Sequence, residues 1–281
     1  MRHLFHTALL ALLFLTTISA EHRQVDQTAA ALWEQAVAAK GGRERLAAIR
    51  SFAIYEETAF SKPLPEFAPS KVHQILCELP DRWWEFLDYR PGKMGYSVTA
   101  ANARTGLGWS TFGGPARPFL RRYTGLPHRL RRLQYAYFLE TSAVRPTPTR
   151  ASRVRLGLKT VDRIEAVFDV DIIVVDLDVD THLPVRVETI TPNTLPPPRP
   201  GMKPPGDIKF VYELSDYEVI GGIKVPTRVK LGSDAARAQV EINPDYEPSI
   251  FITQPSPDAT VESWRKARGF GLKTLVRFRS P

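Results

Sequence analysis

The sequence predicts an α+β protein that is mostly antiparallel β-sheet, and the stretch 208–243 gives the strongest reason. Apolar and polar residues alternate there, with Phe210, Tyr212 and Leu214 on one face. A period of two in β-branched and aromatic residues is typical of half-buried strands. The segments 221–222 and 232–234 supply the glycine-containing turns that hairpins need. We therefore expect a meander of antiparallel strands with one apolar face and one solvated face.

Two helical segments are expected before the first strand. Residues 27–39 are rich in alanine and place apolar residues at helical spacing. Lys40 followed by Gly41-Gly42 is typical of a helix end, because glycine adopts the left-handed conformation that terminates helices. A second, shorter helix is expected over 43–49, with Leu46 and Ile49 facing inward.

The same alternation predicts further strands before the central meander. They cover residues 52–58, 72–79, 82–87, 96–99, 110–112, 153–159, 163–169, 171–180 and 183–190. Trp83 and Trp84 are adjacent in one of these strands and should point to opposite faces. Proline-rich stretches at 61–70 and 192–206 are expected to be loops. After the meander we expect a short helix at 258–267 and either a last strand or an ordered tail at 272–278.

Aspartates are concentrated between residues 169 and 180, and their parity changes between Asp171 and Asp176. We expect a bulge or turn near Ile173, which would restore a common apolar face, and a solvated row of carboxylates. The segment 176–182 lacks the glycine and the closing glutamate of a calcium-binding loop, so no metal site is predicted there.

A basic helix is expected over residues 128–139. Its predicted inner face carries Leu130, Leu133, Gln134 and Tyr137. Its predicted outer face carries Arg129, Arg131 and Arg132. Two interpretations stay open: a surface helix whose arginines are merely solvated, or a helix that binds a ligand.

Positive charge is concentrated in one part of the chain. Residues 89–161 hold 14 lysines and arginines and one acid, Glu140, in a protein whose formal net charge is +8. Such a block can face anionic phospholipids or an acidic partner, or can simply keep the protein soluble. The candidates for a basic binding face are Arg121, Arg122, Arg129, Arg131 and Arg132.

Residues 1–20 are typical of a secretory signal peptide: a basic start, the apolar run 8–15, and small residues before Glu21. We expect cleavage near Ala20 and export to the periplasm; a retained anchor is the alternative. Cys77 is the only cysteine, so a disulfide within one chain is excluded and a buried, inert thiol is expected.

The usual catalytic patterns are absent from the sequence. It contains no Gly-x-Ser-x-Gly elbow, no His-Glu-x-x-His motif and no phosphate-binding loop. The histidines after residue 20 lie far apart, without metal-ligand spacing. We therefore predict a protein without enzymatic activity, without a cofactor and without a metal, although a site assembled from distant segments stays open.

Several short motifs resemble the bacterial periplasmic family of the lipoprotein carrier LolA. They are the segments 38–51, 105–109, 180–186 and 217–226, and a closing pattern from Ile242-Asn243-Pro244 to Pro255. The resemblance implies an open, curved antiparallel sheet, an incomplete barrel, with helices packed on its concave face around an apolar cavity. It implies one domain over residues 21–256, followed by an extension over 257–281.

We thus predict a periplasmic carrier that binds a lipid or the acyl chain of a lipoprotein. The candidates for the cavity lining are Trp83, Phe86, Trp109, Phe112, Leu130, Leu133, Tyr137, Phe210 and Tyr212; an ordinary packed core is the alternative for each of them. The other functional hypotheses are an envelope module that binds proteins or membranes through the basic segment, and a hydrolase with an unrecognised site. Nucleic acid is not an expected partner.

Overall fold

A computed structural model describes residues 28–58, 72–88, 96–102, 104, 107–112, 117–118, 126–192, 206–232, 234–246 and 248–251. The predicted signal peptide, the loop 61–70, most of the loop 192–206 and the segments after 251 lie outside these residues. The contacts divide the chain into two compact units, residues 1–39 with 146–209 and residues 40–145 with 210–281. The single domain expected over 21–256 stays a prediction.

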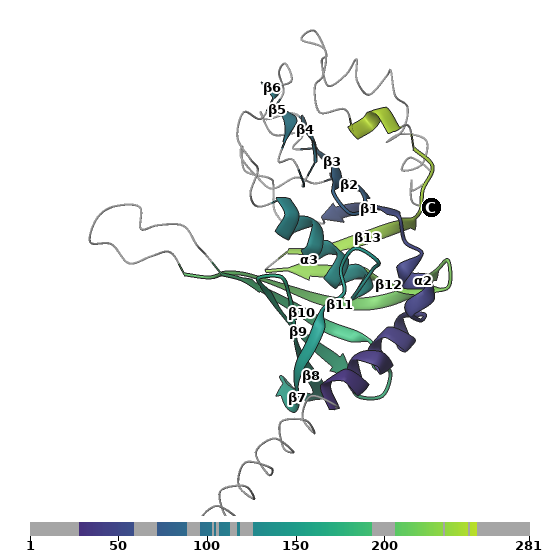
Figure 1. Cartoon of the computed structure of the whole chain (residues 1–281), viewed down its shortest axis with the longest axis vertical. Coiled ribbons are helices and arrows are strands. Elements are labelled where there is room, and N and C mark those ends of the chain that lie inside the picture. Colours follow the sequence, from purple (N-terminus) through teal and green to yellow (C-terminus); the bar gives the residue numbers. More distant parts are fainter. Residues whose placement is uncertain are drawn as a thin grey trace, which may run out of the picture. The chain divides into compact units, whose positions relative to one another are not determined.

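The first unit contains the beginning of the N-terminal helix, which runs through residues 28–40, and four strands. The strands are β7 (Thr147–Leu156), β8 (Lys159–Phe168), β9 (Asp171–Asp178) and β10 (Pro184–Thr191). They pair antiparallel in chain order (Figure 1). The expected strand 153–159 is in fact divided, because Gly157 (φ 61°) and Leu158 form the turn between β7 and β8.

The prediction of solvated aspartates is wrong for two of them. Asp171 and Asp176 are each only 1% exposed. Asp176 accepts hydrogen bonds from Arg163 at 2.6 Å and from Arg186 at 3.3 Å, and the neighbouring strands β8 and β10 supply these two arginines. Asp171 accepts one from the Thr191 hydroxyl at 2.7 Å. Buried carboxylates are tolerated here because each has a charged or polar partner.

The predicted bulge near Ile173 is also wrong. Strands β8 and β9 pair in regular register from Val161 to Phe168, and the irregularity lies on β10, between Pro184 and Arg186. The parity of the aspartates therefore needs no bulge in β9. Both faces of this strand carry buried residues at its second half, where Val175, Asp176 and Leu177 are consecutive and buried.

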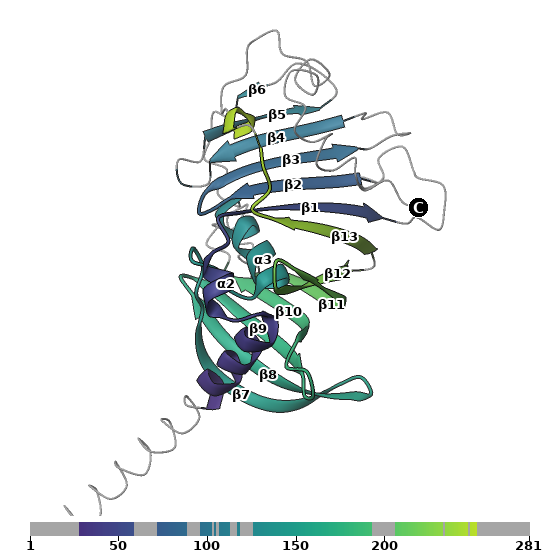
Figure 2. The same cartoon turned by 90° about the vertical axis from the view of Figure 1, so that its right-hand side faces the viewer.

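The second unit contains the helices α2 and α3 and a larger sheet. Its elements are α2 (Arg43–Ala47), β1 (Ser51–Thr58), β2 (Val72–Glu78), β3 (Arg82–Asp88), β4 (Tyr96–Asn102), β5 (Leu107–Phe112), β6 (Arg117–Pro118), α3 (Leu126–Phe138), β11 (Ile208–Ile220), β12 (Ile223–Leu231), β13 (Asp234–Ile242) and the 3₁₀ helix η1 (Pro248–Phe251). The strand order is β6-β5-β4-β3-β2-β1-β13-β12-β11 (Figure 2). The predicted fold class, mostly antiparallel β with an open sheet and few helices, is confirmed.

Glycines at the end of the N-terminal helix permit a close approach to the β11–β12 turn. Gly41 has φ 125°, and a Cβ atom there would lie 2.4 Å from the carbonyl oxygen of Gly222. The predicted helix end and hairpin turn are therefore confirmed, and they meet each other. Among the described helices, none combines the length and the apolar character needed to cross a bilayer.

Asn243 joins the end of β13 to the start of β1. Its side-chain oxygen accepts hydrogen bonds from the backbone N–H groups of Arg50 (2.8 Å) and Ser51 (3.1 Å), and its amide nitrogen donates to the carbonyl of Ala48 (3.2 Å). The closing motif of the sequence thus holds β1, the first strand of the chain, against β13, the last one.

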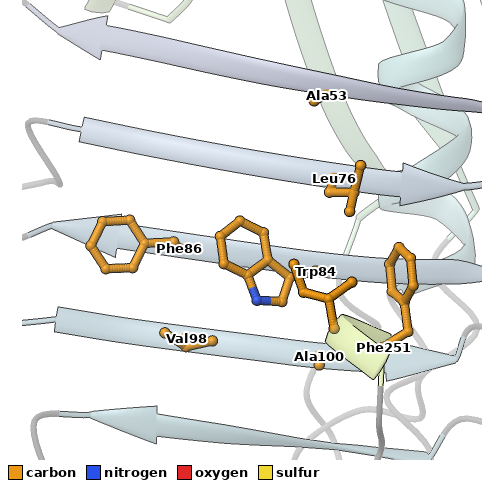
Figure 3. Close-up of a cluster of buried hydrophobic side chains, with 8 residues drawn as sticks. Ala53, Leu76, Trp84, Phe86, Val98, Ala100 and Phe251 are labelled. Atoms are coloured by element: carbon orange, nitrogen blue, oxygen red, sulfur yellow. The ribbon is translucent and has the colours of Figure 1, made fainter. Parts of the chain in front are cut away.

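The two faces of β1, β2 and β3 bury different clusters, because successive side chains of a strand alternate in direction. Leu76, Trp84 and Phe86 project from one face and pack with Phe251 of η1 (Figure 3). Trp83 lies on the other face, which α3 covers. The adjacent tryptophans therefore point to opposite faces, as predicted.

Candidate functional site

Helix α3 packs on the sheet of the second unit through its second half. The ring of Phe138 lies edge-on to that of Phe52 in β1, with 5.0 Å between centroids. Residues 133–138 are all buried, whereas Arg129, Arg131 and Arg132 are only partly so. The helix is thus anchored at its C-terminal end and partly exposed toward its N-terminal end.

A chain of polar side chains lies on the sheet face beneath α3. His73 of β2 stands between two glutamates: its Nδ1 is 3.0 Å from Glu56 of β1, and its Nε2 is 2.6 Å from Glu85 of β3. The Tyr137 hydroxyl donates a 2.8 Å hydrogen bond to Glu56. Arg129 forms a bidentate ion pair with Glu85, in which Nη1 of the arginine lies 2.9 Å from Oε2 of the glutamate. We call these five residues the α3 polar cluster.

The α3 polar cluster is electrically balanced, because two cations face two carboxylates. Burial alone lowers the pKa of His73, but hydrogen bonds and charges from Glu56 and Glu85 outweigh it and raise that pKa to about 9. Burial alone raises the pKa of each glutamate, but His73 and Arg129 lower the pKa of both below the usual value, with help from Tyr137 at Glu56. At neutral pH the imidazole is therefore charged and both carboxylates are ionised.

One further arginine and a cysteine lie near this cluster. The Arg132 guanidinium lies 3.8 Å from the centroid of the Phe210 ring, and that of Arg129 lies 4.8 Å from the Trp83 ring. Such cation–π contacts hold charged groups against aromatic surfaces. Cys77 is buried, and burial raises its pKa well above the ordinary value, so it fits the inert thiol that was predicted.

A buried lysine at the start of the second unit contacts the end of α3. Lys40 is 0% exposed, and its Nζ donates to the carbonyl oxygen of Tyr137 at 2.6 Å. The same ammonium group lies 4.9 Å from the Tyr217 ring. Burial lowers the pKa of Lys40 well below its usual value, since a carbonyl and a ring compensate only part of the lost hydration.

The structure brings six of the nine predicted cavity residues to the face beneath α3. They are Trp83, Leu130, Leu133, Tyr137, Phe210 and Tyr212, and all except Phe210 are buried. Phe86 lies on the opposite face with η1. Trp109 and Phe112 lie in β5, where the described structure covers the strand but not these side chains. Lining of a cavity stays a prediction for all nine.

The predicted outer face of α3 needs correction. Arg129 and Arg132 turn toward the sheet instead of toward solvent, because Glu85 and aromatic rings attract them. Arg131 donates to His128 at 3.0 Å. Arg121 and Arg122 lie outside the described residues. The basic binding face therefore stays a prediction.

Sequence reasoning missed the three sheet residues of the α3 polar cluster. The strand alternation contained the necessary signal, since Glu56, His73 and Glu85 have the parity of the buried Ile54, Ile75 and Trp83 on the same strands. A charged residue at an inward position of each of three neighbouring strands points to a buried network. Among the described residues, no group of three or more potential ligands could hold a metal ion.

Comparison with known proteins gives a distant structural likeness. No protein-family model and no curated protein matches the chain. Among solved structures, the crystal structure of a "putative outer membrane lipoprotein-sorting protein domain" from Vibrio parahaemolyticus is similar. The sequences are 10% identical, the match covers 78% of this chain and 97% of that chain, and the TM-score is 0.39. A likeness at this level carries no functional argument, so the case for function rests on the geometry.

Proposed function

We propose that this protein is a non-catalytic carrier that binds a lipid or the acyl chain of a lipoprotein in the periplasm. The acyl chain lies against the sheet face beneath α3, in the place that Leu130 and Leu133 occupy here. The export signal expected in residues 1–20 supports the periplasmic location.

The observation that carries the proposal is an unused hydrogen-bond donor on this face. The indole Nε1 of Trp83 is buried and has no acceptor among the described residues. A buried donor without a partner costs about 1–3 kcal/mol, and buried polar groups are rarely left unpaired. The carbonyl oxygen of an acyl ester or amide would satisfy this N–H while its chain lies along the neighbouring aromatic rings.

The anchoring of α3 supports the same interpretation. Its second half is buried and contacts Phe52, whereas the contacts of its first half include the ion pair between Arg129 and Glu85. Both of these groups can be hydrated when they separate. We expect the first half of α3 to move away from the sheet as an acyl chain enters. Each methylene of the chain that is buried in this way contributes about 0.8 kcal/mol to the binding free energy.

The proposal is tested by displacing a fluorescent fatty-acyl probe with a long-chain acyl ester. Trp83→Phe removes the indole N–H and should weaken ester binding about two- to tenfold, since a hydrogen bond contributes about 0.5–1.5 kcal/mol. Trp84→Phe is the matched control, because Trp84 is buried on the opposite face. A long-chain hydrocarbon without a carbonyl should bind both variants equally.

A second variant tests the place of the chain. Leu130→Asp combined with Leu133→Asp introduces two carboxylates into a buried interface, which costs several kcal/mol or displaces the helix. We expect less co-purified lipid per folded protein than in the wild type. Equal lipid in this variant, or equal ester affinity in the two tryptophan variants, would contradict the proposal.

A further inference from the structure

A pocket of about 580 Å³ lies in the second unit, and its lining shares no residue with the face beneath α3. Three connections and one aromatic side chain form it: the segment after α2, the β2–β3 turn, the loop after α3, and Tyr246 after β13. Its volume falls in the range of roughly 300–1,000 Å³ that is typical of small-molecule sites.

Hydrogen bonds hold the walls of the pocket in place. The Leu79 N–H donates to the Arg50 carbonyl at 2.8 Å, which joins the turn to the segment after α2. In the loop after α3, the Ala143 N–H donates to the Thr141 hydroxyl (3.2 Å), which itself donates to Gln134 of α3 (2.6 Å). A ligand would therefore meet a site that is largely formed before binding.

The charged groups of the pocket differ in what they already contact. The Glu78 carboxylate accepts from the Tyr246 hydroxyl at 2.5 Å and pairs with Arg82 at 3.2 Å. Arg50 is exposed, and its guanidinium has no hydrogen-bond or ion-pair partner in the described part of the chain. Glu78 is thus neutralised by groups of the protein, whereas the charge of Arg50 is available.

The remaining lining is suited to an apolar body. Leu79 is partly buried and Pro80 is exposed, so both present apolar surface to the pocket. Ser142 adds one exposed hydroxyl. The geometry points to a binding site for a small amphiphilic oxyanion, in which Arg50 holds a carboxylate or phosphate group and the apolar body contacts Leu79 and Pro80. A guanidinium group can form bidentate hydrogen bonds with a carboxylate or with a phosphate.

This site is independent of the acyl site proposed beneath α3, and the experiment separates the two. Isothermal titration and ¹H–¹⁵N NMR of the whole chain with octanoate should show binding, with shifts at the amides of Leu79, Ser142 and Ala143. Arg50→Gln should weaken octanoate binding at least about tenfold. Arg228→Gln, which removes an exposed arginine of β12 outside the pocket, should leave it unchanged.

The other arms identify the chemistry and its source. Octanol and octylamine keep the apolar body and lack the anion, so both should bind at least about tenfold more weakly than octanoate. Octyl phosphate and phosphatidylglycerol vesicles represent a lipid head group; binding of these alone, lost in Arg50→Gln, also supports the site and assigns it to lipid. Equal binding of octanol and octanoate, an equal effect of the two arginine variants, or loss of binding in Trp83→Phe instead of Arg50→Gln would overturn the proposal.

Discussion

Replacing His73 by glutamine should change how the stability of the second unit depends on pH. The pKa of His73 is about 9 in the folded protein and near 6.5 in an unfolded chain. Because the folded state holds the proton more tightly, protonation stabilises the fold. This contribution is fully present below pH 6.5 and is lost as the pH rises through about 9.

The size of the effect follows from the difference between the two pKa values. A difference of roughly 2.5 in pKa corresponds to about 3 kcal/mol at most. The side chain of His73 is 20% exposed, so solvent screening removes only part of this contribution. The stability lost by His73→Gln should therefore be about 2–3 kcal/mol larger at pH 6 than at pH 10.

Urea denaturation followed by tryptophan fluorescence, at intervals from pH 5.5 to pH 10, measures this difference. Leu76→Ala is the matched control, because it removes buried apolar volume on the opposite face of the same strand and should cost about 2–5 kcal/mol at every pH. Parallel stability curves for the wild type and His73→Gln would refute the role assigned to the α3 polar cluster.

Three further predictions concern buried charges and a close backbone contact. The stability of the wild type should rise as the pH increases from the lowered pKa of Lys40 to about 10.5, because the unfolded chain binds the proton more tightly. Thermal unfolding across this range should show no such rise for Lys40→Met. Gly41→Ala should destabilise by at least about 2 kcal/mol, because its Cβ would meet the Gly222 carbonyl, and clearly more than Gly42→Ala, whose Cβ meets nothing within 4 Å; equal midpoints in urea would contradict this contact. Asp176→Asn should cost about 3–5 kcal/mol by leaving two partly buried arginines without their shared carboxylate, and an unchanged midpoint would show that the pair contributes nothing.

The dependence of stability on pH at acid pH gives a second test of the His73 prediction. The lowered pKa values of Glu56 and Glu85 stabilise the fold above about pH 4.5, and this contribution disappears as the pH falls through the folded-state values. Greatest stability of the α3 polar cluster is therefore expected between about pH 5 and pH 6.5.

The order and type of the elements could be predicted because they depend on local patterns. Strands β1 to β4 and β8 to β13 form within a few residues of the expected positions, and Gly221 and Gly232, both with positive φ, form turns where turns were predicted. The periodicity of two acts through each strand's own sequence. An error occurred where a turn lay inside a run that alternates apolar and basic residues as a strand does, as at Gly157.

Candidate site residues were harder to predict, because their role depends on partners that are distant in the chain. The alternation in 82–87 places Trp83 and Glu85 on one face, but it does not say that His73 and Arg129 meet Glu85 there. Likewise, the basic character of α3 was evident, yet a carboxylate on the sheet turns Arg129 inward.

The sequence by itself determined the fold class, the helix end at Gly41 and the opposite directions of Trp83 and Trp84, since steric and hydrophobic periodicity act over a few residues. Only the tertiary structure decided which charges are buried. The sequence predicts a solvated acid at Asp176, whereas in the folded chain strands β8 and β10 bring two arginines to it. In the sequence Arg50 is one basic residue among many, and only the folded chain places a pocket formed by three connections beside it. A charge is stable in the interior only when a distant segment supplies its partner, and that pairing is a property of the folded chain.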